Sequence, residues 1–561
     1  MHRGPTVLAI LTVLLGLTPA LAGCARPAPA ASQALTVSLE GGPGTLDPTL
    51  ASQATTFDVL NNVMEGLVRL DGNGVPRQGL ASAWKESADG LTYTFTLRRS
   101  SWSNGDPVTA QDFVYAWDQA LDPRTAAPYR SAFQYLAGAA PLLQLRLPDP
   151  KADAAGYQSA VAKIPALLSK LGVQAVGTHT LVVHLASPTP YWLQMAALPP
   201  YFPVDETLAK RLGPGKYGSS VADVAFDGPF VVQTWTRRSE LDLAANPRYW
   251  DRSAVHLGAV HMLEVTEPAT EINLWSTGKL DAMLPSIPST YVSQYQGQPG
   301  FQTQVQASTW FLVVNTGDPL LTNLDVRQAL SLAIDRQQLA TDVVKGNAQP
   351  ASSLVPPVVH YAPGKLFAPL VSTRLPVTAQ ASSARQHLAA GLKALGQANL
   401  GTLTLQVMNN SAQQTLAQAL QAMWQTNLGI TVQIRPLDPT ADFASMGQGK
   451  FQLSLLSWNA DYDDPTTFLD LFQGGASLNL TGWRDPVFDH ALADAATQTS
   501  ATARGQDLAD AEKEFLAQLP ALPLFWTARN WIVRPDVHGL VMYETGPDYS
   551  LKGVTVSGAS R

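Results

Sequence analysis

The sequence predicts an α/β protein with more than one domain, and three observations support this prediction. The chain has 561 residues, more than a single hydrophobic core holds, so we expect roughly two to four domains. A strand, a helix and a second strand follow one another at 403–407, 413–426 and 430–434, which is the order of a βαβ unit. Residues 310–315 form an almost continuous apolar run, which is typical of a strand in a sheet that is covered on both faces.

Composition limits the classes of function. Apolar residues make up 45% of the chain, as in soluble globular proteins, whereas charged residues make up only 14% against a usual ~25%. The net charge of -7 argues against a nucleic-acid partner. Fewer ionised carboxylates leave fewer groups to be protonated at low pH, so we interpret the low charge as an adaptation to an acidic exterior.

The amino terminus looks like a lipoprotein signal. A short basic head precedes an apolar segment at 7–17 that is too short to span a bilayer comfortably, and Leu21-Ala22-Gly23-Cys24 follows at once. We expect residues 1–23 to be the signal peptide and 24–34 to be a lipidated tether, rich in alanine and proline. An ordinary secretory signal with a chance cysteine is the alternative. Cys24 is the only cysteine, so disulfides within the chain are excluded. No later segment is apolar enough to span a bilayer.

Local patterns predict further elements along the chain. Alternation indicates strands at 35–39, 91–97 and 181–185 and a hairpin of 230–235 with 241–244, and helical spacing indicates helices at 55–64 and 324–339. Residues 70–74 have the composition of a hairpin turn. Thr109 and Asp112 have the spacing of a capping box, which predicts that a helix begins there.

A strand-to-helix corner at 451–472 is the candidate site. Alternation predicts a strand from Phe451 to Trp458, and Asp464 with Pro465 predicts the start of a helix. Trp458, Asp461 and Tyr462 then lie at the carboxyl end of a strand, where open α/β sheets place their ligands. An aromatic ring beside a carboxylate suits a ligand with a cationic end, such as a free peptide amino terminus.

Two other interpretations of this corner are open. The acids near Pro465 are also compatible with an ordinary solvated loop that carries a helix cap. Calcium binding by Asp461, Asp463 and Asp464 is the third, but these residues lack the turn glycine and the distal glutamate of a loop that wraps the ion.

Signals for catalysis are missing from the sequence. It contains no G-x-S-x-G elbow, no complete phosphate-binding loop and no H-E-x-x-H pair. Nine histidines are scattered, and the nearest pairs have a five-residue spacing in expected strand or loop, where they do not share a face. We therefore predict no catalytic residues, no metal site and no cofactor.

Specific segments relate the chain to a known family. They are Leu46-Asp47-Pro48, Glu65-Gly66-Leu67, 80–84, 92–117, 125–129, Gly228-Pro229-Phe230, 246–250, 326–330, Ile334-Asp335-Arg336 and 458–469. They occur in order along nearly the whole mature chain. In these segments the chain resembles the solute-binding proteins of oligopeptide and dipeptide ABC importers, family 5 of the bacterial extracellular solute-binding proteins, and within them the oligopeptide branch.

The resemblance implies a domain organisation. The expected fold is α/β, a two-lobed periplasmic-binding-protein fold of class II, the large peptide-binding type, with an extra α+β domain inserted in lobe 1. Lobe 1 then comprises residues 35–64, 206–309 and 528–561, and the extra domain comprises 65–205. Lobe 2 comprises residues 310–527.

The resemblance also implies roles for single residues. Asp461 matches the acid that pairs with the α-ammonium of the ligand, Trp458 lies on a strand edge that pairs with the peptide main chain, and Tyr129 faces the ligand from the other domain. Asn459 and Tyr462, in the same corner, complete our candidate site. The alternative is that Tyr129 and Trp458 are core aromatic residues.

The implied function is capture of oligopeptides by closure of the two lobes and delivery to an ABC permease with its ATPase subunits. We expect a monomer outside the cytoplasm, anchored to the cell membrane through lipid on Cys24. The alternatives are a non-peptide ligand on the same fold, such as a metal chelate, glutathione, haem or an oligosaccharide, and a peptide-sensing receptor that does not transport.

Two positions depart from the pattern of the family. Asn459 stands where many relatives have a cysteine, so their disulfide bridge cannot form. Leu455 stands where the enteric relatives place an arginine that neutralises the carboxylate of a short peptide. We therefore expect a weaker preference for one short peptide length, or a ligand whose carboxyl end is held elsewhere.

Overall fold

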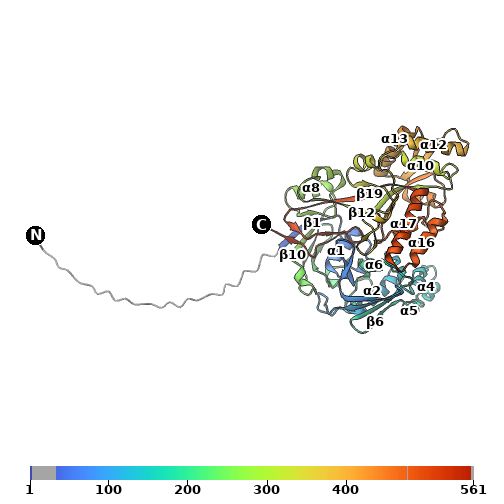
Figure 1. Ribbon diagram of the computed structural model, residues 1–561. Coiled ribbons are helices and arrows are strands. Elements are labelled where there is room, and N and C mark those ends of the chain that lie inside the picture. Colours follow the sequence, from blue (N-terminus) through green and yellow to red (C-terminus); the bar gives the residue numbers. More distant parts are fainter. Residues whose placement is uncertain (3–32, 477, 558–561) are drawn as a thin grey trace.

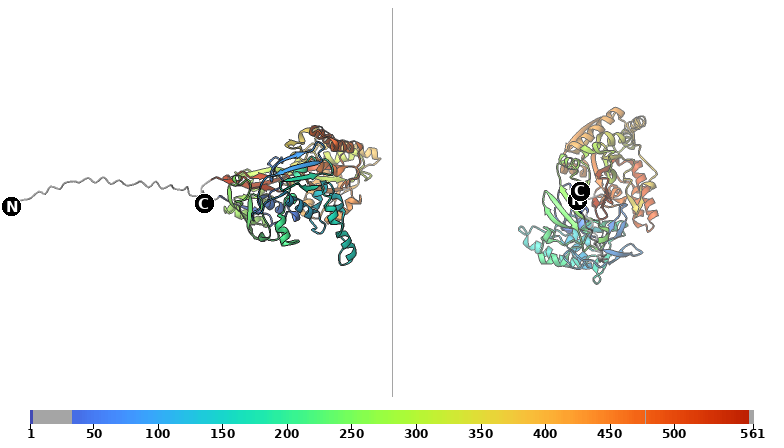
Figure 2. Two further views of the ribbon diagram at one scale, coloured as in Figure 1. Left: turned by 90° about the horizontal axis from the view of Figure 1, so that it is seen from below. Right: turned by 90° about the vertical axis from the view of Figure 1, so that its left-hand side faces the viewer.

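The computed structural model describes residues 1–2, 33–476 and 478–557. Cys24 and nearly all of the predicted signal peptide lie outside these residues. The chain forms two lobes, which Figure 1 shows with the blue to green half of the chain below and the yellow to red half above; Figure 2 gives two further views. No helix among the described residues is long and apolar enough to cross a membrane.

One large sheet runs through both lobes. Its path is β17-β16-β18-β12-β19-β11-β1-β10-β9-β8, and β13 (Ala348–Pro350) pairs with β19 beside it. The strands on the lobe 1 side are β1 (Gln33–Leu39), β8 (Phe230–Thr236), β9 (Glu240–Ala245), β10 (Leu257–Glu264) and β11 (Ala282–Met283). Those on the lobe 2 side are β16 (Thr402–Met408), β17 (Thr431–Leu437) and β18 (Leu453–Asn459).

Two long antiparallel strands, β12 (Phe301–Val314) and β19 (Ala521–Val533), connect the lobes. Residues 301–305 pair with 528–532 beside lobe 1, and 309–313 pair with 521–526 inside lobe 2. The register shifts between Val305 and Thr309, so the ladder is interrupted where the chain passes from one lobe to the other.

Helices cover both faces of the lobe 2 sheet. Along β12, Leu312 and Val314 pack into one core with α10 (Leu324–Leu332), α12 (Ala381–Leu395) and α13 (Ser411–Leu428). Phe311 and Val313 pack into a second core with α15 (Thr466–Leu469), α16 (Pro486–Thr497) and α17 (Ala501–Gln518). The prediction from the apolar run at 310–315 is therefore confirmed.

A separate antiparallel sheet with the order β4-β5-β7-β6 packs beneath lobe 1. It consists of β4 (Ala81–Glu86), β5 (Thr92–Leu97), β6 (Val173–Ala175) and β7 (Thr180–His184). The capping box is confirmed at the start of α2 (Ala110–Leu121), where Asp112 accepts hydrogen bonds from the backbone and hydroxyl of Thr109. Other helices here are α3 (Ala139–Gln144), α4 (Ala154–Val161), α5 (Ile164–Leu168), α6 (Trp192–Met195) and α7 (Glu206–Leu212).

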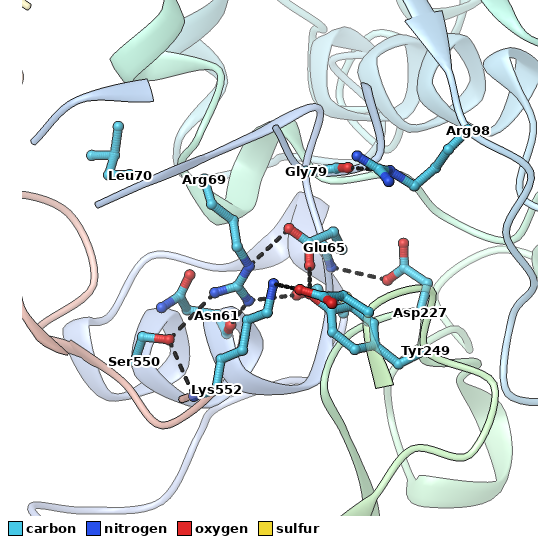
Figure 3. A network of polar contacts seen from close by, with 12 residues as sticks. Asn61, Glu65, Arg69, Leu70, Gly79, Arg98, Asp227, Tyr249, Ser550 and Lys552 are labelled. Atoms are coloured by element: carbon cyan, nitrogen blue, oxygen red, sulfur yellow. Dashed lines mark hydrogen bonds and ion pairs between the residues drawn. The ribbon is translucent and has the colours of Figure 1, made fainter. Parts of the chain in front are cut away.

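A buried polar network ties the carboxyl-terminal segment to lobe 1 (Figure 3). Glu65 and Arg69 form an ion pair of 2.8 Å with 0% and 8% of their side chains exposed. The hydroxyl of Tyr249 donates a hydrogen bond to Glu65. The guanidinium of Arg69 donates to the carbonyl of Asn61 and to the hydroxyl of Ser550, so the buried groups of Glu65 and Arg69 both have partners.

Most predicted elements are confirmed. The hairpin turn at 70–74 joins β2 (Val68–Leu70) to β3 (Pro76–Gln78), and the helix expected at 55–64 is α1 (Ala54–Val63). The βαβ unit is β16, α13 and β17, with parallel strands. The single helix expected at 324–339 is wrong, because α10 ends at Leu332 and Asp335 begins a new helix by accepting a hydrogen bond from the backbone of Gln338.

Candidate functional site

The predicted strand-to-helix corner lies where lobe 2 faces lobe 1. β18 ends at Asn459, and the backbone N–H of Ala460 still donates to the carbonyl of Ala307 on β12. Pro465 precedes α15, which continues as a 3-10 turn at Asp470–Phe472. The hydroxyl of Thr467 in α15 accepts a hydrogen bond of 3.1 Å from the backbone N–H of Asp461. The new helix thus holds the loop that carries Asp461.

The three acids of this corner have different environments. Asp463 accepts hydrogen bonds of 2.8 Å from the backbone of His360 and contacts its ring at 2.8 Å. Asp464 forms a buried ion pair with Arg504 at 2.7 Å and 2.8 Å. No donor or cation in the described part of the chain contacts the carboxylate of Asp461. The acids therefore do not converge on one point, as a calcium loop requires.

Asp461 lies between two adjacent cavities. One has a volume of about 500 Å³ and the other of about 560 Å³, and Tyr129, Trp458 and Asp461 line both. The first is also lined by Gln134, Tyr135, Thr466, Asp470 and Gln473, and the second by Ser52, Gln306, Asn459, Arg529, Glu544 and Asp548. Both cavities thus take walls from the two lobes.

β18 presents a free edge to these cavities. Its whole length pairs with β12 on one side, but on the other side β16 pairs only with Leu453 and Ser454. Among the described strands, none pairs with residues 455–459 on that side. The unpaired backbone groups beside Trp458 can therefore accept an added extended chain.

The charge of the site is mainly negative. Enclosure by the cavity walls raises the pKa of Asp461, although its side chain still contacts water. Loss of hydration between the cavity walls, with a smaller contribution from Asp464, raises the pKa of Asp470 to about 7, although the residue is exposed to solvent on its open side. Glu544 also has a raised pKa, mainly through burial. Arg529 is the one cation among the residues that line the two cavities, and it is ion-paired with Asp548.

The structure brings four of the five predicted site residues together around open space. Tyr129 packs edge-on against Phe57 at 5.4 Å, and partial burial, with a smaller contribution from the charge of Asp461, raises its pKa. Trp458 carries a buried indole N–H that has no acceptor among the described residues. Asn459 is exposed in the second cavity. These positions allow Tyr129, Trp458, Asn459 and Asp461 to contact one ligand.

Tyr462 is placed differently from the other four. Its ring stacks on that of Tyr191 from the opposite lobe, with centroids 3.9 Å apart and planes at 4°, and Tyr135 packs edge-on at 6.5 Å. One face of Tyr462 is therefore covered by protein. This residue joins the lobes beside the first cavity, where it still forms part of the wall.

Sequence reasoning missed Asp470, Glu544 and Arg529. The helical pattern could have predicted that Asp470 points away from the core, because Phe468, Leu469 and Phe472 are buried and position 470 lies on the opposite face of the helix. Glu544 and Arg529 come from the distant carboxyl-terminal part of the chain, and no local pattern relates them to Asp461.

Comparisons with known proteins agree with this architecture. A sequence model described as bacterial extracellular solute-binding proteins, family 5 Middle, matches residues 75–479. The oligopeptide-binding protein OppA of Bacillus subtilis is 30% identical over 524 residues, which cover 92% of this chain and 91% of that protein.

Solved structures give the same result. The unliganded open form of the murein tripeptide-binding protein MppA superposes with a TM-score of 0.79 at 26% identity, covering 94% of this chain and 98% of that one. The peptide-bound OppA of Listeria monocytogenes superposes with a TM-score of 0.66 at 28% identity, covering 94% and 100%. The predicted two-lobed α/β fold is confirmed. The chain belongs to the bacterial extracellular solute-binding proteins of family 5.

Proposed function

We propose that this protein is a lipid-anchored, extracytoplasmic receptor that captures oligopeptides between its lobes and delivers them to an ABC permease. The relatives named for oligopeptide binding support the ligand class. In this proposal Asp461 binds the peptide ammonium and the edge of β18 pairs with the peptide main chain. Tyr129, Asn459 and Tyr462 complete the walls around the ligand.

The unpaired carboxylate of Asp461 is the observation that carries this proposal. Its neighbours Asp463 and Asp464 are both engaged by lobe 2, whereas Asp461 faces the cavities beside the free edge of β18. A peptide ammonium placed there gains a charge-assisted hydrogen bond in a partly dry environment, where such a bond is stronger than at the surface. An extended peptide also supplies the main-chain partners that the edge lacks.

Lobe closure is supported by the position of the connecting strands. Among the described strands of the large sheet, only β12 and β19 run through both lobes, and their pairing is interrupted at 305–309. Rotation there brings Tyr129 toward Asp461, since the two lie on opposite lobes and line the same cavities. The higher TM-score against an unliganded open form than against a peptide-bound form is consistent with an open arrangement.

Calorimetric titration of the purified protein with tetra-alanine and with N-acetyl-tetra-alanine tests the proposal. We expect Asp461→Asn to weaken binding of tetra-alanine by roughly 2–5 kcal/mol, or about 30-fold or more, because an ammonium is left buried without its partner. Acetylation should cost the native protein a similar amount. In the Asp461→Asn variant, acetylation of the peptide should weaken binding little further, because the substitution and the acetyl group remove the same interaction.

Asp470→Asn is the matched control, since it removes another acid from the same cavity. It should keep most of the affinity and the full effect of acetylation. Equal binding of both peptides by the native protein would contradict the assignment of Asp461.

The anchor is tested separately. Cys24→Ser removes the only thiol that can carry the lipid. We expect this variant to move from the membrane fraction to the soluble extracytoplasmic fraction, because the receptor without acyl chains has no stable membrane attachment. Unchanged membrane association would contradict the predicted lipidation.

A further inference from the structure

A third, apolar cavity lies behind Trp458, and we name it the apolar recess. It has a volume of about 90 Å³. It is lined by Phe311, Val313, Phe443, Leu456, Ser457, Trp458, Leu471, Phe472, Leu478, Leu480 and Thr481. Trp458, Leu471 and Leu478 also line the first large cavity, so the recess adjoins the cleft that contains Asp461.

The lining of the recess favours an apolar occupant. None of its residues is charged, and its only polar side-chain groups are the hydroxyls of Ser457 and Thr481 and the indole N–H of Trp458. Two of its walls, Phe443 and Leu478, leave 46% and 54% of their surface exposed. A water molecule in such a space finds few hydrogen-bond partners, and apolar cavities of this kind stay dry and bind hydrocarbon. Covering the exposed walls with another apolar group is favourable.

We propose that the apolar recess binds a leucine-sized side chain from one of the first two residues of the bound peptide. This inference rests on the proposed function, because it places the peptide ammonium at Asp461. A peptide that lies extended along the free edge of β18 then passes Trp458 with its amino-terminal residues. Successive side chains of an extended chain point to opposite faces. One of the first two side chains therefore faces the recess and the other faces away.

The volume sets the size of that side chain. A space of about 90 Å³ equals roughly three water molecules in the liquid, which suits a branched aliphatic group and leaves an alanine methyl with empty space around it. A cationic or acidic side chain would lose its hydration there without gaining a partner. The recess thus selects for Leu or a similar residue, while the two large cavities accept varied side chains.

Four peptides test this selection by calorimetric titration: tetra-alanine and its variants with leucine at position 1, 2 or 3. We expect leucine at either position 1 or position 2, but not both, to strengthen binding by roughly 10- to 50-fold, from burial of about three additional carbon atoms. Leucine at the other positions should change the affinity by about threefold or less.

Phe443→Ala removes an exposed wall of the recess and should reduce that preference to a few-fold. Val487→Ala is the matched control, because Val487 is 63% exposed in the same lobe and lines none of the cavities described above; it should keep the full preference. Leu456→Ala enlarges the recess, so it should shift the preference at the same position from leucine to phenylalanine, a change that misfolding cannot produce.

The outcomes separate this inference from the proposed function. If no peptide binds, the function falls and this inference falls with it. If all four peptides bind equally, peptide capture stands and the recess has no role in selection. If leucine is preferred but Phe443→Ala and Leu456→Ala both leave the preference unchanged, another pocket selects the side chain and the inference is overturned.

Discussion

The role of each acid at 461–464 follows from its partners and not from its residue type. The carboxylate of Asp463 is bound by His360. The carboxylate of Asp464 is ion-paired with Arg504, and only 3% of the Asp464 side chain and 6% of the Arg504 side chain are exposed. Both acids hold the corner in place. Asp461 contributes only its backbone N–H to the corner, through Thr467, so its carboxylate is free to bind a ligand. The local sequence pattern placed the three acids together without separating these roles, and only the resemblance to the family pointed to Asp461.

Asp461 predicts a pH dependence of peptide affinity. Its pKa is raised in the free protein, and a bound ammonium lowers it again, so the complex releases the proton that the free carboxyl holds. Affinity is therefore full above the raised pKa and falls by up to about tenfold per pH unit below it. Titrations with tetra-alanine between about pH 7.5 and 4.5 should show this decline in the native protein and a flatter profile in Asp461→Asn.

Asp470 is a second group that titrates in the same cavity, with a pKa of about 7. Asp470→Asn separates its contribution and should leave the decline at lower pH intact. A native profile that is flat down to about pH 4.5 would mean that the ammonium does not meet Asp461.

The cleft offers little to the carboxyl end of a peptide. Leu455 is fully buried in the lobe 2 core, and Arg529 is already paired with Asp548. We expect tetra-alanine and its carboxyl-terminal amide to bind within about threefold of each other, because the described residues that line the two cavities include no unpaired cation to distinguish them. Competition of the two peptides against a fluorescent tracer measures this ratio, and rejection of the amide by tenfold or more would reveal a cationic group that binds the carboxylate.

At the scale of the elements, many polar residues in the family-like segments have structural roles. Arg327 donates to the carbonyls of Leu321 and Gln518, and Arg336, fully buried, donates to the carbonyl of Pro523. Gly228 lies so close to the backbone of Met64 that an added Cβ would come within 2.4 Å of its nitrogen. The side chains of such residues donate hydrogen bonds to buried backbone carbonyls, or are small enough to allow close packing. The segments therefore identify the fold.

Elements were predictable where their signal is local, and contacts between elements were not. The strands, the βαβ unit and the cap at Thr109 follow from periodicity and capping chemistry. The stacking of Tyr462 on Tyr191 joins parts of the chain that are far apart in sequence, and no pattern within either segment encodes it. The domain boundaries inferred from the resemblance stay a prediction.

The Glu65–Arg69 network gives an element-scale test. Arg69→Met should lower the free energy of unfolding by roughly 3–5 kcal/mol, because it leaves the buried carboxylate of Glu65 without its cation. Arg77→Met removes an arginine whose side chain is 64% exposed and which pairs with Asp71 at the surface; it should cost less than about 1 kcal/mol. Urea denaturation followed by tryptophan fluorescence compares the two, and equal costs would show that the network contributes no special stability.

At the scale of the whole molecule, the site is a product of the tertiary fold. The two cavities draw residues from 52–57, 128–135, 195–198, 306–308, 457–476 and 529–548, together with Leu478. Sequence reasoning found the stretch that contains Asp461, because a strand-to-helix corner has a recognisable pattern. Of the opposite wall it named only Tyr129, through the resemblance to the family, since the position of that wall depends on how β12 and β19 set the two lobes against each other.

The buried acids predict how stability depends on pH. Burial raises the pKa of Glu512 and Glu271 to about 7 and that of Asp47, Asp112 and Asp118 to about 6. The folded state therefore binds protons at pH values where the unfolded carboxyls are still ionised, so stability rises as the pH falls from above 7 toward about 5. Asp71, Asp89 and Asp242 have lowered pKa values and oppose this trend only at more acidic pH.

Thermal unfolding measures this dependence. We expect the Tm near pH 5 to exceed that near pH 7.5 by ~2–4 °C, in line with the sequence interpretation that the protein works in an acidic exterior. Glu512→Gln should raise the Tm near pH 7.5 and flatten the profile, because the amide needs no proton to be neutral in a fully buried site. Glu240→Gln, at an exposed position, should leave the profile unchanged. A Tm that falls steadily between about pH 7.5 and 5 would contradict the assigned sign of the shifts and the acidic habitat together.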